Sequence, residues 1–236
     1  MQLSKIEEKT YETLKRGNLL IFKPKDISLL LKISKTKAYN LIKALKKKNA
    51  IESIQSGIYA LHGTSEFVIA TSLNWPSYII FWTALNYHNL TEQMPKTIFL
   101  ASTKYKKQRK NFKFILVSKK RFFGYVMINS IVIAEKEKSL IDSLLFPKYA
   151  GGIKEIEKAF SNALASLDIK KLIAYAIKIK SKAVVRRLGY LLEKNKIKGY
   201  FLKQLLKNEG KGYELLDPTL KRKNNFNKTW LLDINT

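Results

Sequence analysis

Basic and amide side chains gather between residues 34 and 47, and their chemistry suits binding rather than bond cleavage. Lysine ammonium groups contact phosphates, and an asparagine amide can pair with the edge of a base. The candidate DNA contacts in this stretch are Ser34, Lys35, Thr36, Lys37, Tyr39, Asn40, Lys43 and Lys47. Lys46 and Lys48 extend the charged run, for which a solvated helix face is the alternative interpretation. For Tyr39 the alternative is shielding of the core.

Two short helices must position these side chains. Pro24 suits the first turn of a helix over Lys25–Leu31, because the missing N–H of proline has no partner there anyway. Ser34 can then cap a second helix that begins near Lys35. The second helix has a core-facing stripe with spacings of three and four, formed by Ala38, Leu41, Ile42 and Leu45. This pattern predicts a helix-turn-helix.

A β-hairpin is predicted directly after the second helix. Apolar residues between Ile51 and Leu61 surround Gln55, Ser56 and Gly57, and the glycine supplies the turn. Gln55 and Ser56 therefore join the candidate DNA contacts. The whole stretch is typical of a winged helix-turn-helix, whose second helix places its N-terminal residues in the major groove, within a domain spanning residues 1–62. Winged folds also serve as protein-interaction modules.

Composition bounds the functions that remain. The chain has 236 residues, a formal net charge of +27 and 46% hydrophobic residues, so it can fold around a core and attract a polyanion. Duplex DNA, RNA and an anionic membrane surface are all compatible with this charge. Because the chain has no cysteine, disulfides, thiolate catalysis and Cys-based zinc sites are excluded. We expect no cofactor and no metal.

Residues 63–236 are predicted to form a second domain of mixed structure, which makes the fold class α+β with a small antiparallel sheet and several helices. The predicted strands are Thr97–Ala101, Phe112–Val117, Phe122–Phe123, Val126–Ile133 and Lys228–Ile234. The predicted helices are Ser77–His88, Ala134–Phe146, Ile153–Leu164, Ile169–Lys180, Ala183–Lys194 and Ile197–Lys207. The uncharged stretch 67–91 contains Pro76 and several asparagines, so we do not expect it to span a membrane. Without the apolar run of a signal peptide at the N-terminus, a cytoplasmic location is expected.

A second basic stretch lies between Lys96 and Ile133, with ten basic residues and no acidic one. Part of it is predicted to be a hairpin loop that reaches a phosphate backbone. The candidate contacts there are Lys104, Lys106, Lys107, Arg109 and Lys110. A solvated loop is the alternative.

An enzyme is the rival class, and a metal-dependent nuclease is its most specific form. Glu135 and Asp142 lie seven residues apart and are expected to share a helix face, but structural capping or ion pairing is the preferred interpretation of both. Glu209-Gly210-Lys211 is a weak nuclease-like element, and the chain has no phosphate-binding Gly-x4-Gly-Lys loop. No catalytic residue is predicted. An RNA-binding protein is supported by charge but lacks a glycine-aromatic RNA signature.

Several motifs follow one another in the second domain. The first is Pro76–Pro95, and the second is Glu137–Asp142 together with Pro147, Tyr149, Gly151 and Gly152. Later come Arg187–Glu193 and the terminal Trp230. In this order they resemble the motifs of AbiEi-type antitoxins, which belong to type IV toxin–antitoxin systems of phage abortive infection. Ser139 departs from the family pattern, where alanine is commoner.

The resemblance implies a transcriptional autorepressor and antitoxin in antiviral defence. Its winged domain would recognise an inverted repeat in the operator of its own operon. Its partner would be a nucleotidyltransferase-like toxin, neutralised without a stable toxin–antitoxin complex. A stand-alone DNA-binding regulator without a toxin is the alternative.

Overall fold

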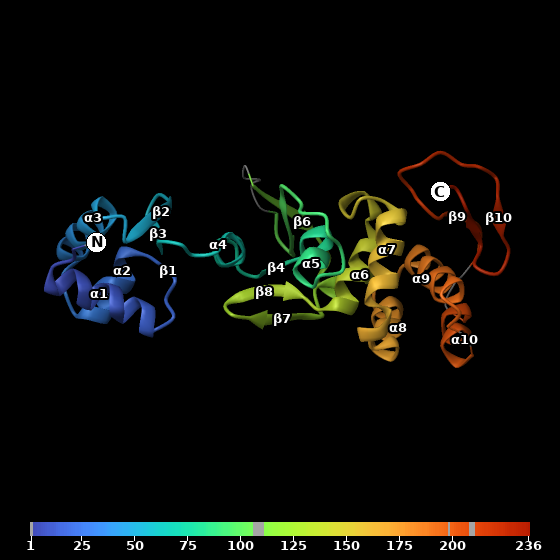
Figure 1. Cartoon of the computed structure of the whole chain (residues 1–236), viewed down its shortest axis with the longest axis horizontal. Coiled ribbons are helices and arrows are strands. Elements are labelled where there is room, and N and C mark those ends of the chain that lie inside the picture. Colours follow the sequence, from blue (N-terminus) through green and yellow to red (C-terminus); the bar gives the residue numbers. More distant parts are fainter. Residues whose placement is uncertain (1, 106–110, 198, 208–210) are drawn as a thin grey trace. The chain divides into compact units, whose positions relative to one another are not determined.

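A computed structural model describes residues 2–105, 111–197, 199–207 and 211–236. The chain forms two compact units, Met1–Leu73 and Asn74–Thr236 (Figure 1). The division falls after helix α4 (Glu66–Leu73), whereas the sequence predicted it after residue 62. As predicted, the fold is α+β.

The first unit combines helices with a three-stranded antiparallel sheet of order β1-β3-β2. Its elements before α4 are α1 (Lys5–Arg16), β1 (Ile21–Phe22), α2 (Pro24–Leu31), α3 (Lys35–Lys47), β2 (Ile51–Gln55) and β3 (Ile58–Leu61). The core beneath α3 contains Leu14, Ile27, Ala38, Ile42 and Leu45. The predicted stripe of α3 is therefore buried, which turns the opposite face of this helix outward.

A tight turn joins α2 to α3. Lys32 takes the left-handed conformation with φ 52°, and the N–H of Ile33 donates to the carbonyl of Ser28 at 3.1 Å. The hydroxyl of Ser28 donates back to the carbonyl of Ile33 at 2.6 Å. These bonds satisfy the backbone at the end of α2 and fix the point at which α3 begins.

The second unit is built on a five-stranded sheet of order β6-β5-β4-β8-β7. The strands are β4 (Ser77–Ile79), β5 (Ile98–Ser102), β6 (Phe112–Leu116), β7 (Tyr125–Ile128) and β8 (Ile131–Ala134). The sheet is mixed, because β5 pairs with β6 and β4 with β8 in parallel. The prediction of a small antiparallel sheet was thus correct for the β4–β5 and β7–β8 pairs and wrong for the other two pairs. It failed because parallel pairing depends on how distant segments return, which a local pattern does not record.

Three predictions around the sheet need correction. The expected helix Ser77–His88 is a strand followed by α5 (Phe81–Tyr87), since Tyr78 and Ile79 lie fully buried in the middle of the sheet. The expected strand Val126–Ile133 is the β7–β8 hairpin. Asn129 and Ser130 turn it with φ 47° and 67°. Phe122 and Phe123 lie in no strand.

Helices and the C-terminal tail complete the second unit. The helices are α6 (Lys136–Leu145), α7 (Ile153–Ala163), α8 (Ile169–Lys178), α9 (Lys182–Lys194) and α10 (Tyr200–Leu206). Single 3-10 turns lie at Lys119–Arg121, Pro147–Tyr149 and Leu164–Ser166. The tail contributes β9 (Glu214–Leu215), β10 (Phe226–Asn227) and β11 (Leu232–Asp233). Trp230 and Leu232 of the tail are fully buried in the helical core.

Within the described part of the chain, no helix is long and apolar enough to cross a membrane. The uncharged stretch 67–91 is divided among α4, β4 and α5.

Candidate nucleic-acid interface

The N-terminus of α3 is open to solvent. Ser34 caps the helix as predicted, with its Oγ accepting the N–H of Lys37 at 3.3 Å. Ser34, Lys35, Thr36 and Lys37 are all exposed. The unpaired amides and the positive end of the helix dipole at such a terminus favour an anion, and the flanking lysines add full positive charges. This end of α3 therefore has the charge and the exposed backbone to hold an anion such as a phosphate.

The exposed face of α3 carries polar and basic side chains along its whole length. Asn40, Lys43 and Lys47 are exposed, as is Lys46, and Tyr39 is 53% exposed. Tyr39 therefore does not shield the core. Seven lysines and no acidic residue lie between Asp26 and Glu52. Among the described ion pairs, none involves the lysines of α3 itself.

Lys48 lies just past this face and is engaged elsewhere. Its Nζ lies 2.6 Å from Oε2 of Glu7 on α1, and the same carboxylate accepts the N–H of Ser4 at 2.6 Å. The hydrogen bond from Lys48, followed by that from Ser4, lowers the pKa of Glu7. Lys48 thus ties α1 to the end of α3.

The β2–β3 hairpin turns at Ser56 and Gly57, and Gly57 has the left-handed φ of 71° that favours glycine. Ser56 is exposed, so it can reach a ligand beside the hairpin. Gln55 is half-buried and already interacts within the protein. Of the two predicted contacts in this hairpin, Ser56 is the more accessible.

The second basic stretch is only partly described. Lys104 is exposed, and its N–H donates to Oγ of Ser102 at 3.3 Å. Lys106, Lys107, Arg109 and Lys110 lie outside the described residues. Because β5 and β6 pair in parallel, these two strands do not form the hairpin that the sequence predicted.

The segment Glu137–Asp142 contains a buried ion pair that sequence reasoning missed. Nζ of Lys138 pairs with Oδ1 of Asp142 one turn later and lies 3.1 Å from the hydroxyl of Tyr78 on β4. Burial lowers the pKa of Lys138 and raises that of Asp142, each against the opposing pull of its partner. Burial also raises the pKa of Tyr78, so its hydroxyl stays protonated. The i, i+4 spacing was the signal, but nothing local marked the pair as buried.

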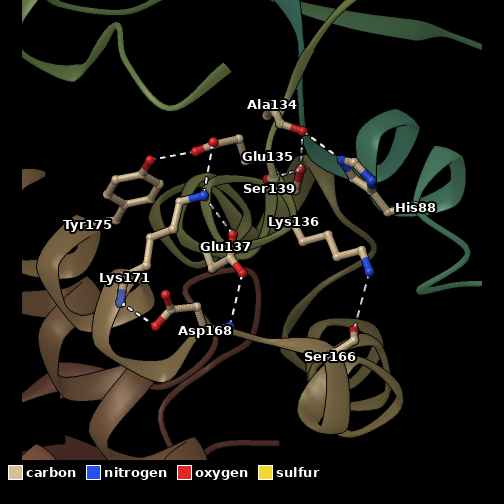
Figure 2. A network of polar contacts seen from close by, with 10 residues as sticks. All are labelled: His88, Ala134, Glu135, Lys136, Glu137, Ser139, Ser166, Asp168, Lys171 and Tyr175. Carbon is tan, nitrogen blue, oxygen red and sulfur yellow. Dashed lines mark hydrogen bonds and ion pairs between the residues drawn. The ribbon is translucent and has the colours of Figure 1, made fainter. Parts of the chain in front are cut away.

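A surface network joins α6 to α8 (Figure 2). Nζ of Lys171 lies 2.9 Å from Oε1 of Glu135 and 3.5 Å from Oε2 of Glu137. The hydroxyl of Tyr175 donates to Glu135 at 2.5 Å, and burial together with this bond raises the pKa of Tyr175 to about 12. Burial opposes ionisation of Glu135, but the bonds from Tyr175 and Lys171 hold its pKa below the usual value.

Glu135 and Asp142 do not act together. Glu135 precedes α6 as its N-cap and faces α8, whereas Asp142 is buried against Lys138. Each carboxylate therefore has its own structural partner, as the ion-pairing interpretation expected. Among the described residues, no group of three His, Asp or Glu side chains is placed to hold a metal ion.

His88 contacts the start of α6 from the side opposite Tyr175 (Figure 2). Its Nε2 donates to the carbonyl of Ala134 at 2.7 Å. Burial lowers the pKa of His88, against the effect of this hydrogen bond. Since Ala134 directly precedes the N-cap of α6, His88 helps position the start of that helix.

Among known proteins the chain has a structural likeness but no matching family. No family model matches the chain, and neither does any curated protein. The structure is similar to the crystal structure of the RV2827C protein from Mycobacterium tuberculosis, with a TM-score of 0.68 and 10% sequence identity. The match covers 98% of this chain and 92% of that one. At this identity the likeness shows the fold alone.

Proposed function

We propose that residues 1–73 form a winged helix-turn-helix that binds duplex DNA, and that the protein is a transcriptional regulator. In this proposal α3 is the recognition helix and the β2–β3 hairpin is the wing. Lys35, Lys37 and Asn40 contact base edges or the adjacent phosphates, while Lys43 and Lys47 contact the backbone.

The observation that carries the proposal is the exposed face of α3. It presents lysines and an asparagine next to an exposed helix N-terminus, and no carboxylate among the described ion pairs neutralises these lysines. A face that served only for solubility would not need to lack acidic residues over 25 positions between Asp26 and Glu52. A cationic face at a helix-turn-helix fits the negative surface of a duplex.

The biological role follows from the motif resemblance and stays a proposal. An AbiEi-like antitoxin would act in the cytoplasm, repress its own operon from an inverted repeat, and counter a nucleotidyltransferase-like toxin without a stable complex. A gene for such a toxin beside this one would support that role. Without it, the stand-alone regulator becomes the better assignment.

The test is binding of the full chain to the DNA upstream of its own gene, measured by fluorescence anisotropy over a range of salt concentrations. We expect tighter binding to an inverted repeat than to random duplex, with affinity falling steeply as salt rises. Replacing Lys35, Lys37 and Asn40 by alanine should relax specificity, at a cost of about 1–3 kcal/mol for each lost base contact.

Equal affinity for random and operator DNA would contradict sequence-specific regulation. Cleavage of DNA or RNA by the purified protein that depends on Mg²⁺ would instead support the nuclease alternative.

A further inference from the structure

A third basic stretch lies in the second unit. Residues 169–207 contain twelve basic residues and one acidic residue, Glu193. Oε2 of Glu193 accepts the indole N–H of Trp230 at 2.8 Å. Among the described basic residues, Lys171 pairs with Glu137 of α6 and Lys194 with Glu157 of α7. The stretch still carries a large positive surplus, which attracts a polyanion.

A groove opens within this stretch, between α8 and α10. It has a volume of about 510 Å³ and is lined by Ile177, Tyr200, Lys203, Gln204 and Lys207. The last four residues recur at spacings of three and four, so they share one face along α10. Ile177 supplies an apolar wall from α8. The groove therefore combines an aromatic ring, an apolar surface and two ammonium groups.

The ring of Tyr200 is held in place while it remains accessible. Nε2 of Gln204 donates to the hydroxyl of Tyr200 at 2.7 Å, which fixes the edge of the ring. Tyr200 is nevertheless 69% exposed. Among the described ion pairs, none involves Lys203 or Lys207. An exposed ring held by its own helix is suited to stacking.

We propose that this groove binds an unpaired segment of RNA, with a base stacked on Tyr200 beside Ile177 and phosphates at Lys203 and Lys207. Base stacking on an aromatic ring together with backbone contact to lysines is how proteins hold single strands without reading their sequence. A duplex cannot offer the face of a base within its stack, whereas RNA loops and ends do. An acidic peptide would pair with the two lysines but would offer no planar group to stack on the ring of Tyr200.

The site is separate from the DNA-binding face proposed for α3, because it lies in the other unit and uses none of the same residues. The two proposals can therefore fail independently. Binding of operator duplex serves as the internal control in every variant.

The experiment uses the full chain and a fluorescein-labelled single-stranded RNA of about 12 nucleotides, within the usual site sizes for single strands. Tyr200→Ala should weaken RNA binding by at least about five-fold, whereas Tyr200→Phe should retain it because the stacking face remains. Lys203→Gln combined with Lys207→Gln should reduce the slope of log affinity against log salt by about 1.4. Binding of operator duplex should stay unchanged in all of these variants.

The matched control is Lys170→Gln with Lys182→Gln, which removes the same charge from exposed positions outside the groove. It should change the salt slope less than the groove pair does. The proposal is overturned if Tyr200→Ala binds RNA within about two-fold of the unchanged protein, since stacking is worth more than that. It is also overturned if a blunt RNA duplex competes as well as the single strand. Tighter binding of a DNA strand with the same sequence would overturn the assignment to RNA.

Discussion

Gly189 lies directly against the indole of Trp230. A Cβ atom placed on Gly189 would be 2.0 Å from Cζ3 of Trp230, which is far inside any real contact. Trp230 is fully buried, and its Nε1 donates to Glu193, one turn further along α9. The segment Arg187–Glu193 thus provides both the space and the hydrogen-bond acceptor that hold the C-terminal tail on the helices.

Gly189→Ala should destabilise the second unit. The methyl group has no room, so either the indole or α9 must shift, and overpacking of this kind costs about 1–3 kcal/mol or more. Urea unfolding followed by far-UV circular dichroism measures the loss. Because Trp230→Leu removes the ring that fills this space, we expect Gly189→Ala to cost much less in that background. An equal cost in both backgrounds would show that the contact is not the cause.

Local patterns predicted the elements whose signals are local. The cap at Ser34 and the stripe from Ala38 to Leu45 specify α3 within one stretch of chain, and α3 begins at Lys35 as predicted. Gly57 likewise marked the hairpin turn. The exposed face of α3 followed from the same stripe, since burying one side of a helix exposes the other.

The remaining features depend on partners far along the chain. The run Tyr78–Ile80 has no polar position between its apolar side chains, so its pattern does not separate a buried helix from a buried strand. The β5–β6 pair is parallel, and the local pattern of each strand does not record the direction in which it pairs. Lys138 meets Tyr78, which lies 60 residues earlier, so its burial could not be inferred from α6 alone.

Asp142→Asn should strongly destabilise the fold near neutral pH. It leaves the ammonium of Lys138 buried without a counter-charge, and breaking a buried pair from one side costs about 3–5 kcal/mol. Burial already lowers the pKa of Lys138 against the pull of Asp142, so the variant lowers it further. A lysine whose pKa is lower in the folded protein than in the unfolded chain contributes most to stability at a pH above the unfolded-chain pKa. This contribution is lost as the pH falls through the pKa of the folded protein. The variant should therefore recover stability as pH rises toward 10.

The control is the double variant Lys138→Met with Asp142→Leu. An apolar pair of similar size should restore much of the stability, because neither charge then needs solvation. Equilibrium unfolding at about pH 7 and about pH 9.5 separates the cases, since a folded pKa lowered from the ordinary value of 10.5 makes stability rise with pH below that value. If the free energy of unfolding of Asp142→Asn changes with pH just as that of the unchanged protein does, the result would argue against a charged Lys138.

Protonation of His88 should make the second unit less stable in weak acid. Burial lowers its folded pKa below the ordinary value of 6.5, with Lys136 adding to this effect while Ala134 and Glu137 oppose it. The neutral ring is thus the form that folding favours. Its contribution is full above the unfolded pKa and is lost as pH falls through the folded value. The free energy of unfolding should therefore decline from about pH 7.5 to about pH 5.5.

His88→Ala tests this assignment. It should cost about 1 kcal/mol at pH 7.5 through loss of the hydrogen bond to Ala134, and it should flatten the decline toward pH 5.5. Chemical unfolding at both pH values gives the two numbers. If the variant keeps the full pH dependence, the titrating group lies elsewhere.

Substitutions of the lysines near the end of α3 should distinguish an effect on DNA binding from an effect on stability. Lys43→Gln with Lys47→Gln should weaken binding to operator and random duplex alike, and should reduce the salt slope by about 1.8 if both side chains neutralise phosphates. Lys48→Gln is the matched control, because Lys48 holds Glu7 at 2.6 Å instead of facing outward. It should lower the midpoint of thermal unfolding and leave the salt slope unchanged. A salt slope that falls with Lys48→Gln, or stays constant when Lys43 and Lys47 are replaced, would mean that the duplex lies on a different face of this unit.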